Sequence, residues 1–292
     1  SEPNLKHARH SLENLDLIVS QDIFANETAL YAHVILPAAS FAGKAGTFTN
    51  TERRVQRVRP ALSPPGIARP DLDIIIDLAQ RLEQRLGTHV QPGWDYEGPD
   101  EVWAEVGQVA PEFRGITYQR LEKVGIQYPC YDETDPGTVY LFEEGVPRGR
   151  GLFWPLEFIP PVETPDEIYP FNLSTGRLLY HWHGGTMTRR SSLNDIAPEP
   201  VVEINPVDAR SIPIASGDLV RIASRRGEIV ARTEVTDRSP IGTVFLPFHY
   251  IEAAANLLTL DELDPTAKIP DYKNTAVAIT PTEVHNWEMV LE

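Results

Sequence analysis

The hydrophobic pattern of this 292-residue chain changes near Pro165, and that change limits the folds it can adopt. Before Pro165, two largely apolar runs at Leu17–Ser20 and Val34–Pro37 flank a helix-compatible stretch, which is typical of parallel strands covered by helices on both faces. After Pro165, short β-rich runs are separated by Gly, Pro and Asp turns, which favours a compact β-barrel. The pattern therefore predicts an α/β unit followed by an all-β unit.

Three segments are predicted along the chain. Residues 1–90 contribute part of a doubly wound α/β domain, including a helix that follows Asp71 and stops at Gly87. Residues 91–165 are rich in Pro, Gly and acidic residues, which indicates a connector or an insertion. Residues 166–292 form the predicted barrel, which a brief helix at Val207–Arg210 interrupts.

The composition excludes several classes of function. Acidic residues outnumber Lys and Arg by 42 to 26, and a net charge of -16 argues against general nucleic-acid binding. The single cysteine, Cys130, excludes a disulfide framework and a cysteine-rich metal site, and it favours a cytoplasmic location over the alternative, the periplasm. No apolar run is long enough for a membrane span, so none is expected.

The segment Thr175–Arg190 holds the densest set of glycines and hydrogen-bond donors in the sequence. Glycine lets backbone N–H groups approach an anion, threonine adds hydroxyl donors, and arginine offers a fork for pyrophosphate oxygens. An ordinary turn with scattered polar groups is the alternative. His181 and His183 would suit zinc, but a third ligand at a matching spacing is lacking because His249 is remote. A zinc site is therefore not expected.

Two charged residues of the first segment are further candidates. Asp71 could cap the helix that follows it or bind a ligand, and its carboxylate can accept two N–H groups from the edge of guanine. Lys44 lies between Gly43 and Gly46, where it could meet a phosphate or remain a solvated loop lysine. The spacing does not match a Walker-type phosphate loop.

Several stretches of the chain, taken together, carry a family resemblance. They are Gln21–Phe24 with Glu27–Ala29, Val34–Phe41, Gly46–Gln56, Thr175–Arg190, and the group of Leu263–Pro265, Lys268, Pro270, Tyr272 and Lys273. In this order they resemble the catalytic subunits of molybdopterin-guanine-dinucleotide oxidoreductases of the DMSO reductase family, and most closely the formate dehydrogenases. The resemblance implies a partial doubly wound parallel-sheet domain followed by a six-stranded double-psi-type β-barrel.

The resemblance also implies two sets of cofactor-binding residues. The guanosine and phosphate end of one dinucleotide would be surrounded by Gln21, Asp22, Lys44 and Asp71. Pterin and pyrophosphate would be contacted by a loop in which Arg177 and His181 are the strongest candidates, and Phe248 could equally belong to the core. The members of this second set are Thr175, Gly176, Arg177, Leu178, Leu179, Tyr180, His181, Trp182, His183 and Gly184, completed from the barrel by Phe248, Asn256 and Lys273.

The sequence departs from the family at the reaction centre. Family members carry an iron–sulfur cluster, a metal-ligating Cys or selenocysteine, and an adjacent His and Arg in the preceding half of the polypeptide, and these motifs do not occur here. Cys130 does not match the ligand position, and Gly184 stands where many relatives have Thr. Ser1–Asn4 also resembles an internal family segment. We therefore expect neither a catalytic nor a metal-ligating residue in this chain, and we expect the isolated chain to be inactive.

The implied complete enzyme interconverts formate and carbon dioxide at molybdenum or tungsten held by two pterin guanine dinucleotides. Its implied partners are the N-terminal remainder of the catalytic subunit and electron-transfer subunits with iron–sulfur clusters or flavin. Two alternatives stay open. One is a fragment of a periplasmic-type nitrate reductase, and the other is a non-catalytic module that binds the pterin cofactor or has a structural role.

Overall fold

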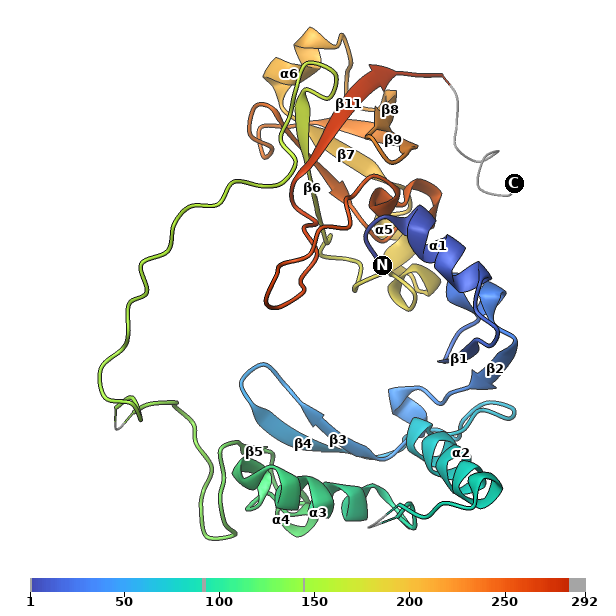
Figure 1. Cartoon of the computed structure of the whole chain (residues 1–292), viewed down its shortest axis with the longest axis vertical. Coiled ribbons are helices and arrows are strands. Elements are labelled where there is room, and N and C mark those ends of the chain that lie inside the picture. Colours follow the sequence, from blue (N-terminus) through green and yellow to red (C-terminus); the bar gives the residue numbers. More distant parts are fainter. Residues whose placement is uncertain (1, 91–92, 144, 284–292) are drawn as a thin grey trace. The chain divides into compact units, whose positions relative to one another are not determined.

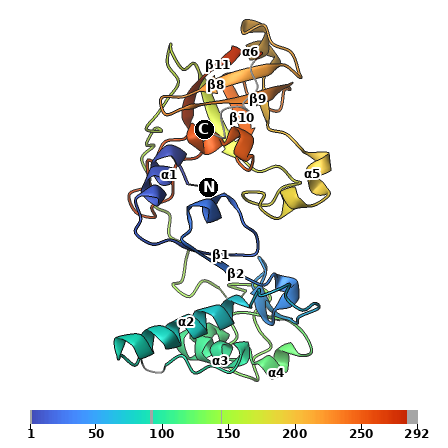
Figure 2. The ribbon, with the colours of Figure 1, turned by 90° about the vertical axis from the view of Figure 1, so that its right-hand side faces the viewer.

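The structure is a computed structural model that describes residues 2–90, 93–143 and 145–283. It divides into two compact units, which we call the α/β unit (Leu17–Pro155) and the barrel unit (Ser1–Asp16 with Leu156–Glu292). Figure 1 labels the helices and strands of both units where there is room, and Figure 2 adds the label of β10. In the described part of the chain, no helix is long and apolar enough to cross a membrane.

The α/β unit contains a parallel pair of strands. β1 (Val19–Asp22) and β2 (Val34–Pro37) are paired along their full length. The 3-10 helix η1 (Glu27–Tyr31) connects them, and the Asn26 side chain caps its start by accepting a hydrogen bond of 3.2 Å from the Ala29 N–H. The predicted parallel pair is therefore confirmed, with a single short 3-10 helix between the strands.

Helix α2 (Asp71–Leu86) follows Pro70 and ends at Gly87, where φ is 64°. Glycine adopts this left-handed conformation without the clash that a Cβ atom would cause, so the helix stops there. The helix places Ile74 in the interior of the α/β unit. The predicted helix is confirmed at both ends.

The remainder of the α/β unit is built on a second, antiparallel sheet. β3 (Gly46–Thr49) pairs with β4 (Arg54–Val58), and β4 pairs with β5 (Ile126–Gln127), which comes from the segment predicted as a connector. The apolar core beside this antiparallel sheet consists of Val55, Ile116, Leu121, Ile126 and Cys130. The shorter elements of the unit are η2 (Phe41–Gly43), α3 (Pro99–Val109), η3 (Pro111–Phe113) and α4 (Tyr118–Leu121).

The barrel unit contains a closed six-stranded barrel with the strand order β10-β6-β11-β8-β9-β7. Its pairs β10–β6 and β7–β9 are parallel, and the other four are antiparallel. Buried and partly buried residues alternate along β6, so one face of the strand fills the interior. The strands are β6 (Phe171–Gly176), β7 (Val201–Ile204), β8 (Leu219–Ala223), β9 (Glu228–Val235), β10 (Thr243–Pro247) and β11 (Thr275–Pro281).

Short helices complete the barrel unit. α6 (Pro206–Ser211) lies at one end of the barrel in both views (Figures 1 and 2) and confirms the predicted brief helix. The amino-terminal helix α1 (Leu5–Glu13) joins this unit, and the Asn4 N–H just before it donates to the Thr259 carbonyl at 3.2 Å. The others are η4 (Thr188–Arg190), α5 (Leu193–Ile196), η5 (Ile251–Ala253) and η6 (Ala255–Leu257).

Candidate functional site

Three of the four residues predicted at the guanosine end are in contact within the α/β unit. Gln21 lies in β1, Lys44 follows η2, and Asp71 is the first residue of α2. The Gln21 Nε2 donates to Asp71 Oδ1 at 2.8 Å, and the Lys44 Nζ forms an ion pair with Asp71 Oδ2. The cluster lies next to the carboxyl end of a parallel strand, where open α/β sheets bind ligands.

The Asp71 carboxylate is held in its charged form. Partial burial alone would raise its pKa, but hydrogen bonds from Lys44 and Gln21 and the charge of Lys44 lower the pKa below its ordinary value. The N-cap of α2 is Pro70, and Asp71 occupies the first helical position. A carboxylate has about four acceptor positions, so two donors leave room for two more.

Asp22, the fourth predicted residue, shapes its own loop. Its Oδ1 accepts a hydrogen bond of 3.1 Å from the Phe24 N–H, and its Oδ2 accepts one of 2.8 Å from the Asn26 side chain. These bonds fix the chain that leaves β1 and leads to η1. Unlike the other three predicted residues, Asp22 therefore stabilises the backbone of its own loop, next to Gln21.

The second predicted set begins at the end of β6 in the barrel unit. The buried Thr175 donates through Oγ1 to the Tyr272 carbonyl at 2.8 Å, and the Lys273 Nζ donates to the Thr175 carbonyl. The Gly176 carbonyl accepts a hydrogen bond of 3.2 Å from the Phe248 N–H. Thr175, Gly176, Phe248 and Lys273 are thus brought together, although they are up to 98 positions apart in sequence.

Glycine at position 176 leaves room for the ring of Phe245. A Cβ atom there would lie 2.6 Å from that ring, so any other residue would force the ring to shift. Phe248 is partly buried and packs against the barrel core. It therefore has the packing role that the sequence offered as an alternative to ligand binding. Asn256 is buried in η6, and its carbonyl accepts from Thr259 Oγ1 at 3.4 Å.

Arg177 is an exposed guanidinium with no hydrogen-bond or ion-pair partner in the described part of the chain. Its Cζ lies 5.9 Å from the centroid of the Trp182 ring. The other exposed members of the loop are Leu179, Tyr180, Trp182, His183 and Gly184, while Leu178 is partly buried. The loop therefore presents a free cation beside an aromatic ring and a glycine, which suits an anion attached to a planar heterocycle.

His181 points into the interior, unlike its exposed neighbours. It is 2% exposed, its Nε2 lies 2.8 Å from the Ala197 carbonyl, and its Nδ1 lies 3.2 Å from Thr188 Oγ1. Because a carbonyl oxygen only accepts, Nε2 donates to Ala197, and the Thr188 hydroxyl can pair with Nδ1 as donor or acceptor. The buried imidazole thereby stabilises the conformation of the loop. Within the described residues, no group of three potential metal ligands includes it.

A bidentate ion pair fixes the far end of the loop. Arg189 Nη1 and Nη2 donate to the two carboxylate oxygens of Glu252 at 2.8 and 2.7 Å, and both side chains are largely buried. The guanidinium also lies 4.9 Å from the Tyr250 ring centroid, and the Tyr250 hydroxyl donates to the Ala197 carbonyl at 2.9 Å. Arg189 is therefore occupied within the protein.

His249 also lies in this region, although its position in the sequence indicated only a histidine too remote to complete a zinc site. It is 4% exposed, and its ring centroid lies 4.6 Å from that of His181 and 4.3 Å from that of Tyr250. Neither ring nitrogen has a hydrogen-bond partner among the described residues. Burial, helped by the charges of His181 and Arg189, lowers the pKa of His249 to about 4. The sequence signal that could have revealed His249 as part of this region is its position directly after Phe248, a predicted site residue.

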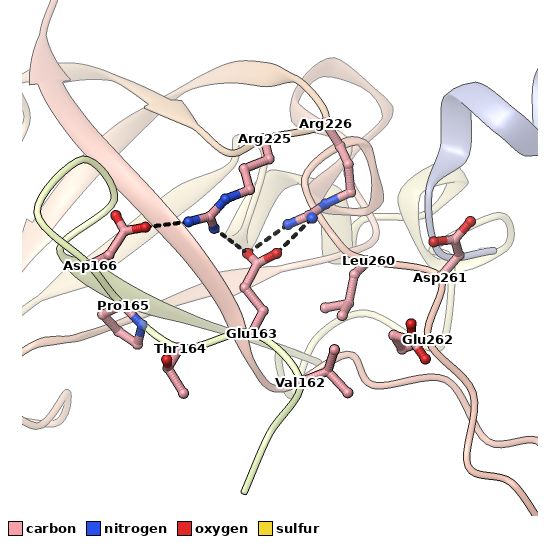
Figure 3. Close-up of a pocket in the computed structure, with 10 residues that line it drawn as sticks. All are labelled: Val162, Glu163, Thr164, Pro165, Asp166, Arg225, Arg226, Leu260, Asp261 and Glu262. Atoms are coloured by element: carbon pink, nitrogen blue, oxygen red, sulfur yellow. Dashed lines mark hydrogen bonds and ion pairs between the residues drawn. The ribbon is translucent and has the colours of Figure 1, made fainter.

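Figure 3 shows a pocket of about 520 Å³ in the barrel unit that contains none of the predicted ligand residues. Arg226 Nη1 and Nη2 donate to the Glu163 carboxylate at 2.7 and 2.8 Å, and Arg225 forms an ion pair with Asp166. Both arginines are thus neutralised, so the pocket does not suit phosphate. The Glu163 carboxylate also accepts the Ala276 N–H at 2.7 Å, which ties the entering chain to β11.

Replacing Glu163 with glutamine should weaken that tie. The carboxylate accepts from an arginine and a backbone amide, and hydrogen bonds to charged groups exceed neutral ones by about 1–2 kcal/mol. We expect the unfolding free energy of the barrel unit to fall by about that amount, measured through hydrogen exchange of its core amides. Glu262→Gln, an exposed change at the same pocket, is the matched control. Equal exchange in both variants would contradict the prediction.

Comparisons with known proteins give matches in both units. Residues 1–81 match the model of the molybdopterin oxidoreductase family, and residues 171–276 match that of the molydopterin dinucleotide binding domain. The F420-dependent formate dehydrogenase subunit alpha of Methanocaldococcus jannaschii is 47% identical over 96% of this chain, which covers 41% of that protein. A nitrate reductase of Symbiobacterium thermophilum is 37% identical over 95% of this chain and is covered to 39%.

The fold has a solved counterpart. Acetylene hydratase from Pelobacter acetylenicus superposes with a TM-score of 0.70 at 19% identity, covering 96% of this chain and 42% of that one. The chain thus spans about two fifths of the length of each of these three proteins. The matched regions include β1, Lys44 and Asp71 in one case and most of the barrel in the other. The chain belongs to the molybdopterin oxidoreductase family, and it contains that family's dinucleotide-binding barrel domain.

Proposed function

We propose that this chain holds the dinucleotide ends of the bis(molybdopterin guanine dinucleotide) cofactor of a molybdenum or tungsten formate dehydrogenase. The observation that carries the proposal is Arg177, an exposed guanidinium on the glycine-containing loop that follows β6 of the barrel, which has no hydrogen-bond or ion-pair partner among the described residues. The match to a dinucleotide-binding domain and to formate dehydrogenase alpha subunits supports this choice.

The guanosine end fits the cluster around Asp71. A charged carboxylate with spare acceptor positions can receive the N1–H and N2–H of guanine. The ammonium of Lys44 uses one of its three N–H groups on Asp71, which leaves two donors for a phosphate. Gln21 fixes the carboxylate through a hydrogen bond of 2.8 Å. In our proposal these residues bind and orient guanosine, and they take no part in electron transfer.

The pterin end fits the loop from Thr175 to Gly184. Arg177 would bind the pyrophosphate as a donor fork, and Lys273 adds charge next to the Thr175 carbonyl. When bound, the cofactor supplies the two-electron redox chemistry, and the protein supplies binding, orientation and electrostatics. The metal ligand and the iron–sulfur cluster would come from the rest of the catalytic subunit.

Changing Arg177 to alanine should lower retention of the pterin dinucleotide by roughly 10-fold or more, since a hydrogen bond to a charged group contributes about 1.5–3 kcal/mol. The change removes a donor fork and no core volume, so both units should stay folded. Pterin bound per polypeptide after gel filtration measures the effect. Arg238→Ala, which removes an exposed arginine elsewhere on the barrel, is the control. Unchanged pterin content in Arg177→Ala would refute the assignment.

The activity itself is tested by reconstitution. Formate-dependent dye reduction and bound molybdenum or tungsten should require both this chain and a polypeptide that carries the Cys or selenocysteine ligand. The name of the Methanocaldococcus jannaschii relative suggests F420 as the electron acceptor, so reduction of F420 by formate is the second assay. We further propose a cytoplasmic location, which cell fractionation tests.

The similarity to a nitrate reductase supports one rival function, a fragment of that enzyme. The same reconstituted complex separates the two, because a nitrate reductase would oxidise reduced dye with nitrate and would not reduce dye with formate. A non-catalytic module predicts cofactor binding without either activity.

A further inference from the structure

The segment Gly151–Val162 exposes several large apolar side chains that lie close together in sequence. It forms no helix, strand or turn up to Pro161 and is drawn as an uncoiled stretch in Figure 1. Within the described residues no hydrogen bond involves it, and Glu157 is its only charged residue. Exposed fractions range from 72% to 96% for Leu152, Phe153, Trp154, Leu156, Phe158 and Ile159.

Such a run is unusual on a finished protein surface. Single exposed apolar residues are common, but contiguous apolar patches mark sites that another surface covers. An interface formed and released repeatedly is only about as apolar as ordinary surface, while a permanent one resembles a domain core. The composition of the segment is that of a core, so its partner should be permanent.

We propose that Gly151–Ile159 is a docking strand for the part of the catalytic subunit that lies outside this chain. This inference rests on the proposed function. The matched formate dehydrogenase subunit aligns with 96% of this chain, while the chain covers only 41% of that subunit. The other part of such a subunit is a large, permanent partner for this segment. A second copy of this chain fits less well, because each copy carries a net charge of -16 and like charges repel.

Pro155 determines which edge of the strand can pair. In an extended strand, successive N–H groups point to opposite edges, and proline has none. The amides of Leu152, Trp154, Leu156 and Phe158 would all point to one edge, and Pro155 interrupts the other. Prolines in sheets occur on edge strands with that side unpaired. The segment is therefore suited to join the partner's sheet as an edge strand through its even-numbered residues.

Residue-resolved hydrogen exchange tests this pairing. Exchange in this chain alone is compared with exchange in the reconstituted complex, in which this chain is joined by the polypeptide that carries the Cys or selenocysteine ligand. We expect the amides of Leu152, Trp154, Leu156 and Phe158 to slow at least 10-fold in the complex, while Phe153 and Glu157 keep exchanging fast. Absence of a complex or of this alternation would overturn the proposal. So would protection that is already present in this chain alone, or that depends on its own concentration.

A variant pair adds an affinity test. Trp154→Ser with Phe158→Ser should weaken complex formation at least 10-fold, whereas Ile67→Ser with Ile241→Ser, which changes two apolar residues exposed by 82% and 64%, should not. Equal affinity of both double variants would reject the docking strand. Pterin retention is read in parallel: retention without docking rejects this inference alone, and loss of retention in every form rejects the proposed function.

Discussion

Replacing Asp71 with asparagine is expected to weaken guanine binding by roughly 100-fold or more. The carboxylate accepts from Gln21 and Lys44 and would accept two N–H groups from guanine. An asparagine replaces one carboxylate oxygen with an NH₂ group, which cannot accept the N–H groups that this oxygen received. Two hydrogen bonds to a charged acceptor, of about 1.5 kcal/mol or more each, are therefore lost. Calorimetric titration of the chain with GMP measures the change.

Selectivity separates this role from a general loss of charge. Inosine monophosphate lacks the N2 amine, so the wild-type chain should bind GMP more tightly than IMP, and Asp71→Asn should lose most of that preference. Asp73→Asn, an exposed change in the first turn of α2, is the matched control because it alters the same net charge and the same helix terminus. If Asp73→Asn weakened GMP binding as much, Asp71 would have no specific contact with guanine.

The fold was largely predictable because it depends on local pattern. Uninterrupted apolar runs predicted the parallel pair β1–β2, and helical spacing followed by Gly87 predicted α2. Short alternating runs predicted the barrel, and the resemblance added its six strands. What the pattern did not reveal is that β5, from the predicted connector, joins β4, because a two-residue strand has no periodicity to detect.

For the candidate site, the sequence predicted which residues lie together better than it predicted where their side chains point. Gln21, Lys44 and Asp71 were named together and are in contact. His181 was named as a ligand contact, yet its ring is buried between Thr188 and Ala197, since side-chain direction in a loop depends on backbone angles that spacing does not encode. Arg189 belongs to the same dense loop but is paired with Glu252, a partner 63 positions away that no local pattern indicates.

The pH dependence of the barrel unit should reveal His249. An unfolded histidine takes up its proton near pH 6.5, whereas in the folded state burial lowers the pKa of His249 to about 4. Between these values the unfolded state holds more protons, so acidification favours unfolding. The stability is complete above pH 6.5 and is lost progressively down to about pH 4, where the loss is about 3 kcal/mol. About 2 kcal/mol of it should be lost by pH 5.

The variant His249→Phe should remove this step. Phenylalanine keeps a ring beside His181 and Tyr250 and has no nitrogen to protonate or to leave unpaired, so its stability at pH 7 should equal or exceed that of the wild type. Hydrogen exchange of barrel core amides, corrected for intrinsic rates, gives the unfolding free energy at pH 7 and pH 5. Nearby Glu252 and Arg189 remain in both proteins, so the difference between the two chains isolates the imidazole. His7→Phe, on the exposed face of α1, should retain the wild-type step; a step of equal size in His249→Phe would assign it to other groups.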